Sequence, residues 1–301
     1  MAAGLGEAAA FATALLWGVS SQIQGAVART IGATEITLLR LPYQIFFLTL
    51  LCLAMRETLV LTPLAFSQLA ISGFLLVCCC DFALYRAMTI IGPAVALLIL
   101  SLSTGFSALF GWLFLGEYAS LQVIAGIAVT LAGIAWVITE HSGSILLPGQ
   151  EIPEGKALAF GVFLAVFASV SFAASFIFLK KALLGGVSPL WATFLRMLVG
   201  GLILWTVGLC RGWTRSLACS LRANPRFYRI LFFSCFCGSV GAWLASLAVH
   251  LAPVGIAATL IGLQPIMVTI IGALWYRKRP SPRAASGILI AFLGTALVCL
   301  R

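Results

Sequence analysis

The sequence predicts an all-α integral membrane protein whose ten transmembrane helices form two inverted five-helix repeats. Three observations lead to this prediction. Of the 301 residues, 62% are hydrophobic and only 9% are charged, whereas soluble domains carry roughly 25% charged residues. The chain also divides into apolar stretches close to the length of about 20 residues that a helix needs to cross a bilayer. Finally, the second half repeats residues of the first half in the same order.

The composition excludes several classes of protein. A chain with so few charges cannot cover a soluble fold, so a soluble enzyme, a nucleic-acid-binding domain and a secreted disulfide scaffold are excluded. The net charge of +10 could suggest an acidic partner, but in a membrane protein Lys and Arg concentrate in the loops between apolar segments. We therefore interpret the excess as a topology signal and expect no nucleic-acid partner.

Ten apolar stretches follow one another along the chain. They lie at residues 8–28, 36–55, 66–88, 92–115, 121–138, 157–179, 190–209, 230–251, 254–276 and 284–300. The first is long enough to cross, and no Lys or Arg precedes it, so we interpret it as a helix rather than a signal peptide. Gly92 and Pro93 predict the break between the third and fourth stretches.

One polar connector, at residues 139–156, divides the chain near its middle. We expect a first repeat at residues 1–138 and a second at 157–301. In the last stretch of each half, Gly126, Ile127, Gly133, Ala135 and Val137 recur 161 positions later as Gly287, Ile288, Gly294, Ala296 and Val298. Pro93 recurs as Pro253, and Arg40 recurs as Arg196.

The number of spans in each half determines how the halves are oriented. Five is odd, so the second half enters the membrane from the opposite face, and an inverted repeat follows. In such repeats, the state open to one side of the membrane is nearly equivalent to the state open to the other side, because the two halves can exchange conformations. The expected use of this architecture is transport by alternating access.

The residues resemble the EamA family of the drug/metabolite transporter superfamily over nearly the whole chain. The resemblance rests on Trp17 with Gly18, on Arg40 and Arg196 in the second and seventh stretches, and on the segment that ends at Glu117. It implies a monomeric or loosely associated carrier in the cell membrane, with a central cavity between the halves. The second half departs from the pattern, since Arg277, Lys278 and Arg279 stand where the first half has the Glu117 region.

Asp81 is the only aspartate in the chain, and it lies well inside an apolar stretch. A carboxyl group in hydrocarbon is costly, so we expect it to face the interior of the bundle. Two interpretations stay open: Asp81 binds a cationic group or a coupling proton, or it makes a structural contact with Arg86, Tyr85 or a neighbouring helix.

Arg40 and Arg196 recur in both halves, which favours a shared structural role such as snorkelling to the interface or capping a helix end. Anion binding is the alternative. Glu35 could pair with Arg40, although a position at a helix N-terminus is the favoured interpretation.

Several uncharged residues complete the expected substrate cavity. Amides suit the recognition of a polar metabolite because they offer donors and acceptors without a charge. Gln22 and Gln24 are two residues apart and cannot both face one cavity; we place Gln22 there, with Tyr85. Gln264 coincides with a kink expected at Pro265. Trp243 is a candidate cavity wall. Serine pairs such as Ser103 with Ser107 are expected to serve helix packing.

These features predict a secondary transporter of a small metabolite or drug-like molecule, moving it outward and coupled to protons. The alternatives are an ion channel or ion carrier on the same fold and an intramembrane enzyme. No Walker-type loop appears. We expect no metal or other cofactor, since the nine cysteines lie mostly in apolar stretches, where cysteine behaves as a small hydrophobe. The expected partners are the substrate and the lipid bilayer.

Orientation in the membrane is predicted in two conflicting ways. Basic residues concentrate in the loops after the odd-numbered stretches, as with Arg29, Arg86 and Lys156. The other face holds Arg56, Lys180, Lys181 and Arg301. The positive-inside rule then places both termini outside, whereas the family resemblance implies termini inside.

Overall fold

A computed structural model describes residues 2–117, 120–141, 155–214, 216–217, 219, 227–275 and 282–299. Every regular element within these ranges is helical. Five helical stretches are long and apolar enough to cross a membrane, and shorter apolar helices accompany them. The five are Ala33–Met55, Pro63–Ile91, Lys156–Leu184, Pro189–Cys210 and Arg229–Leu251.

The helices follow the apolar stretches of the sequence. In the first half they are α1(Ala2–Ile31), α2(Ala33–Met55), α3(Pro63–Gly73), the π-helical segment η1(Phe74–Asp81), α4(Phe82–Ile91), α5(Pro93–Leu100), α6(Ser103–Leu115) and α7(Leu121–His141). In the second half they are α8(Lys156–Leu184), α9(Pro189–Cys210), α11(Phe227–Leu251), α12(Val254–Ile261), α13(Gln264–Trp275) and α14(Pro282–Cys299).

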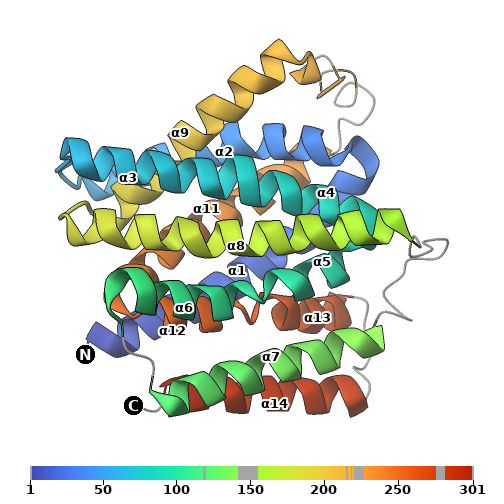
Figure 1. Ribbon diagram of the computed structural model, residues 1–301. Coiled ribbons are helices and arrows are strands. Elements are labelled where there is room, and N and C mark those ends of the chain that lie inside the picture. Colours follow the sequence, from blue (N-terminus) through green and yellow to red (C-terminus); the bar gives the residue numbers. More distant parts are fainter. Residues whose placement is uncertain are drawn as a thin grey trace.

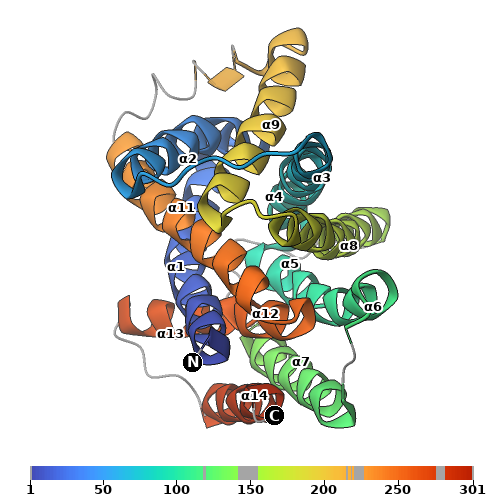
Figure 2. The same cartoon turned by 90° about the vertical axis from the view of Figure 1, so that its left-hand side faces the viewer.

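These helices lie side by side in one bundle (Figure 1). The beginning of α1 and the end of α14 lie at the same end of it. Figure 2 shows α7 and α14 together at one edge, while α8, α9 and α11 lie next to helices of the first half. The elements of the two halves are therefore interleaved.

The third expected stretch is one helical run from Pro63 to Ile91, made of α3, η1 and α4. The expected break follows it at Gly92, whose φ of 84° belongs to the left-handed region that glycine tolerates. Pro93 then begins α5, where its missing N–H costs no helical hydrogen bond.

The fourth and ninth expected stretches are each broken inside. One break lies at Ser101 and Leu102, between α5 and α6, and the other at Gly262 and Leu263, between α12 and α13. Of these two breaks, the sequence predicted only the one between α12 and α13, as a kink at Pro265. Pro265 instead occupies the first turn of α13, where a helix accommodates proline. The first break has no proline and had no signal in the sequence.

Helices α7 and α14 pack closely because each presents a glycine. A side chain at Gly133 would collide with the backbone of Ala291, and a side chain at Gly294 with the backbone of Thr130. Gly133 and Gly294 are 161 positions apart, and so are Thr130 and Ala291. The two contacts are thus reciprocal, and their order shows that the helices run in opposite directions.

Some residues named from the sequence lie outside the described part of the chain. They are most of the connector, at residues 142–154, the basic group of Arg277, Lys278 and Arg279, and Arg301.

Candidate functional site

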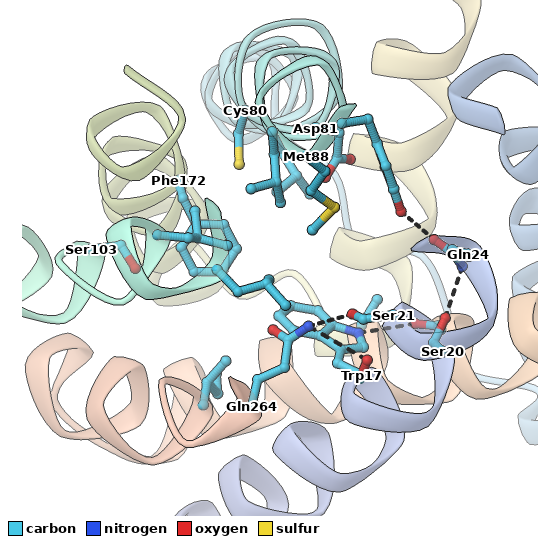
Figure 3. Close-up of a pocket in the computed structure, with 18 of the residues that line it drawn as sticks. Trp17, Ser20, Ser21, Gln24, Cys80, Asp81, Met88, Ser103, Phe172 and Gln264 are labelled. Atoms are coloured by element: carbon cyan, nitrogen blue, oxygen red, sulfur yellow. Dashed lines mark hydrogen bonds between the residues drawn. The ribbon is translucent and has the colours of Figure 1, made fainter. Parts of the chain in front are cut away.

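A cavity of about 100 Å³ lies inside the bundle, between helices of both halves. This volume has room for several water molecules or a small solute. Its walls come from α1, α2, η1 with α4, α5 with α6, α8, α9, α11, and α12 with α13. Figure 3 shows Asp81 and Gln264 at opposite walls.

The wall that carries charge contains an ion pair between Arg40 of α2 and Asp81, the last residue of η1. Their side chains are 7% and 15% exposed. The Arg40 guanidinium also lies over the ring of Tyr85, 5.4 Å from its centroid. All three residues line the cavity. The partner of Asp81 is therefore Arg40, on a neighbouring helix. Arg86, which we had also considered as a partner, is exposed.

Burial of Arg40 excludes snorkelling as its role, because the residue is only 6% exposed and its charged end meets Asp81. Glu35 lies in the first turn of α2 and accepts a 2.5 Å hydrogen bond from Ser216, which agrees with the favoured position at a helix N-terminus.

Arg196 of α9 is a second buried cation beside this pair, and it is 3% exposed. Its guanidinium donates one long hydrogen bond of 3.5 Å to the Ser175 hydroxyl and lies 5.9 Å from the Phe176 ring centroid. The charge of Asp81 also acts on it. Close crossing of the helices brings it there, because side chains at Gly73 and Gly200 would collide with the facing backbone. Arg196 itself does not line the cavity.

A polar network joins the charged wall to α1 and α11. The Tyr85 hydroxyl donates to the Gln24 carbonyl oxygen. The Gln24 amide donates to the Ser20 hydroxyl at 2.8 Å and to the Ser234 hydroxyl at 3.2 Å. Gln24 is 3% exposed and lines the cavity, as does Ser20. The network positions Tyr85 beside Arg40.

Gln22 points elsewhere and is not among the cavity-lining residues. Its amide donates at 2.8 Å to the carbonyl of Val268 on α13. We expected one of the two glutamines at the cavity and chose Gln22, whereas the structure places Gln24 there. A stripe of Trp17, Ser20, Ser21 and Gln24 at helical spacing could have indicated this face of α1.

The opposite wall contains Gln264, the first residue of α13. Its amide donates at 2.5 Å to the Ser21 hydroxyl and at 3.4 Å to the Trp17 carbonyl. Ser103, the first residue of α6, also lines the cavity, although sequence reasoning assigned it to packing. The break before each of these helices brings a polar side chain to the cavity.

Trp17 and Phe172 supply the aromatic wall, and their rings meet edge to face at 6.1 Å. The Trp17 indole also donates at 3.3 Å to the Gly238 carbonyl. Trp243 is half-buried and is not among the lining residues, whereas its neighbour Ala242 is. The tryptophan at the cavity is therefore Trp17 of α1 and not Trp243 of α11.

Among solved structures, the chain is similar to one described as "Crystal structure of protein", over 98% of both chains, with a TM-score of 0.69 and 17% sequence identity. This likeness concerns the fold alone. The chain is also 24% identical over 190 residues to "Uncharacterized transporter YvbV" of Bacillus subtilis (strain 168). The aligned region covers 63% of this chain and 57% of that relative. The match thus spans little more than half of the relative's length.

The EamA-like transporter family matches the chain twice, at residues 4–139 and 159–300. The family and the relative point to a transporter rather than an enzyme. With its apolar helices, the chain is a multi-pass membrane protein and a member of the EamA-like transporter family.

Proposed function

We propose that this protein is a secondary transporter that moves a small metabolite or drug-like molecule outward across the cell membrane by alternating access. The observation that carries the proposal is the cavity, which both halves of the chain line with polar and aromatic side chains. Enclosed, mostly apolar cavities with a few polar groups are the usual form of small-molecule sites.

We further propose ten transmembrane spans in two inverted repeats, at residues 1–138 and 157–301, joined by the connector 139–156. The family matches each half separately. Support also comes from the reciprocal contacts of Gly133 and Gly294 and from the two helix breaks, because Ser101 and Gly262 are 161 positions apart, as the glycines are.

The repeats give alternating access a physical basis. If the two halves exchange conformations, the cavity closes at one end of the bundle and opens at the other. Broken helices suit this motion, since the broken backbone lies in protein around a cavity rather than in lipid. In this proposal α5 with α6 and α12 with α13 move about their breaks.

Asp81 is the group that we propose takes up the coupling proton, and Arg40 is its counterion in the unprotonated state. Protonation would release Arg40 from the pair and change the charge of the cavity wall. Gln24, Tyr85, Gln264 and Trp17 would contact the substrate. Gln22 and Trp243, which we expected at the cavity, are not part of this proposed contact set.

Two measurements test this function. A screen for growth resistance in an efflux-deficient host would identify the ligand class, and uptake into proteoliposomes should then saturate with substrate and show counterflow. Ion currents at channel rates would contradict a carrier. Unchanged growth and accumulation for every compound in the screen would contradict outward transport.

The coupling site has its own test in Asp81→Asn. We expect this variant to fold, to keep substrate counterflow and to lose the dependence of transport on a proton gradient. An unchanged pH dependence would contradict the proposed role of Asp81.

The assembly and orientation are proposed as well. We propose a monomer in the cell membrane, to be checked by the mass of the protein in detergent. A reporter fused to either terminus would decide between termini outside, as the basic residues predict, and termini inside.

A further inference from the structure

The buried charges beside the cavity do not balance. Arg40 and Arg196 are two cations, 6% and 3% exposed. Among the described residues, Asp81 is the carboxylate beside them: it forms the ion pair with Arg40, and its charge also acts on Arg196. With all three ionised, the group carries a net charge of +1. We call these three residues the charged cluster.

Two glutamates of the described residues have hydrogen-bond partners elsewhere in the fold. Glu35 lies in the first turn of α2 and accepts from Ser216, and Glu117 accepts the backbone N–H of Val254 at the start of α12. Within the described residues, the one ion pair is that of Arg40 with Asp81. Since an uncompensated charge in a membrane interior is costly, the cluster favours the arrival of one negative charge.

Unused hydrogen-bonding atoms show where that charge would bind. Arg40 Nε and Gln44 Oε1 are buried and have no hydrogen-bond partner, and both residues line the cavity. They lie four positions apart on α2, so their side chains share one face of the helix. A ligand placed there finds a free donor, Arg40 Nε, on a cation. The neighbouring Gln44 Oε1 is a free acceptor, which would take a hydrogen bond from a hydroxyl or N–H group of the ligand and not from its carboxylate.

The remaining walls are apolar and aromatic, with Leu84, Met88, Leu100 and Phe172 among the lining residues. They fit a ligand with a hydrocarbon or aromatic body. The net charge of the charged cluster also favours some anions over others, because the carboxylate of one bound ligand brings that net charge from +1 to zero. A phosphate monoester, with a charge of about −1.5 to −2, would make it negative.

We propose that the cavity takes a small organic monocarboxylate, with its carboxylate at Arg40 and its apolar body against Trp17 and Phe172. This rests on the proposed function and names the substrate class of the same cavity. Arg196 does not touch the ligand, and it supplies the positive charge that Asp81 leaves uncompensated.

Ligands that differ only in charge test the proposal. The purified protein in nanodiscs would be heated with benzoate, benzamide, benzylammonium or phenyl phosphate, and in parallel with butyrate, butyramide or butylammonium. A ligand that binds the folded state raises its unfolding midpoint. We expect benzoate or butyrate to raise the midpoint by about 2 °C or more at saturation, and the others to raise it less.

Arg196→Gln makes the cluster neutral without touching the ligand. We expect this variant to fold and to lose the preference of carboxylate over carboxamide, while Arg196→Lys keeps it. Lys181→Gln removes a cation from the last turn of α8 and is the matched control, with the preference expected to be unchanged.

The outcomes separate this proposal from the transport function. Stabilisation by the amides, the ammonium ions or phenyl phosphate above the carboxylates would overturn the substrate class and leave a transporter of another ligand. So would an unchanged preference in Arg196→Gln. No shift with either carboxylate would also overturn it, while failure of saturable counterflow with the ligand from the resistance screen would overturn transport itself.

Discussion

Ser103 and Gln264 occupy matching places in the two halves of the chain. Each is the first residue of a helix that follows a break, and both line the same cavity. They are 161 positions apart, the spacing that also relates Gly133 to Gly294. The two sites differ in chemistry, since one side chain carries a hydroxyl and the other an amide. The repeated backbone therefore presents unlike polar groups to the cavity.

The two glutamines of α1 allow a matched comparison. We predict that Gln24→Leu lowers transport at least about tenfold, because Tyr85, Ser20 and Ser234 lose their shared amide. Gln22→Leu, which loses a single contact with Val268 outside the cavity wall, should lower it by less than half that factor. Initial transport rates, corrected for the amount of folded protein, check both. Equal losses would show that Gln24 acts through packing alone.

A double-mutant cycle tests the pair of Arg40 and Asp81. Each single variant, Arg40→Gln or Asp81→Asn, leaves a buried polar or charged group without its partner. We predict that removal of either partner lowers the free energy of unfolding by roughly 3–5 kcal/mol, and that the double variant loses less than the sum. Reversible unfolding in detergent measures these values. Additive losses would mean that the pair contributes no coupling energy.

The packing of α7 on α14 predicts the effect of a single methyl group. Gly294→Ala should lower the stability by about 1–3 kcal/mol, because the added Cβ meets the backbone of Thr130 and Gly126. Gly105→Ala in α6 is the control, since no atom lies within 4 Å of its added Cβ. Thermal unfolding of the two purified variants compares them. A control variant as unstable as Gly294→Ala would point to backbone effects instead of collision.

Neighbouring lysines at the end of α8 have different surroundings. Lys180 donates to the carbonyls of Val249, His250 and Ala252, where α11 ends, at 2.5, 3.2 and 2.9 Å. We predict that Lys180→Met destabilises the protein by about 1–3 kcal/mol, since these carbonyls lose a charged donor.

Lys181→Met is the matched control for this cap. Lys181 lies 5.8 Å from the Phe114 ring centroid, and its removal should change the stability by less than about 1 kcal/mol. If both variants unfold at the same temperature, the cap at the end of α11 does not stabilise the fold.

Hydropathy predicted the helical character of the chain and the positions of its helices because a bilayer requires long apolar segments. Gly92 with Pro93 predicted a helix break correctly, since both residues act on their own backbone. The break at Ser101 lacks such a residue. There the Ser101 hydroxyl bonds the Leu97 carbonyl at 3.0 Å, and the facing Gly262 lies against Thr104. The first contact is local, between residues four positions apart, and the second depends on packing between helices.

The same division applies to the cavity. Scarcity singled out Asp81, because one acid in an apolar stretch must be compensated. Its partner Arg40 comes from another helix. The close crossing of α3 and α9, at Gly73 and Gly200, brings Arg196 beside this ion pair. A linear pattern contains no information on these meetings between helices.

Membrane class and family membership follow from local and periodic properties of the sequence, because hydrophobic length and repeated residues do not depend on how the helices meet. The choice of Gln24 over Gln22 depends on the rotation of α1 about its axis. That rotation is set by Trp17, which packs against Gly241 and donates to Gly238 on α11. Only the packed bundle decides it, since two residues on one helix face opposite ways and the neighbouring helix selects between them.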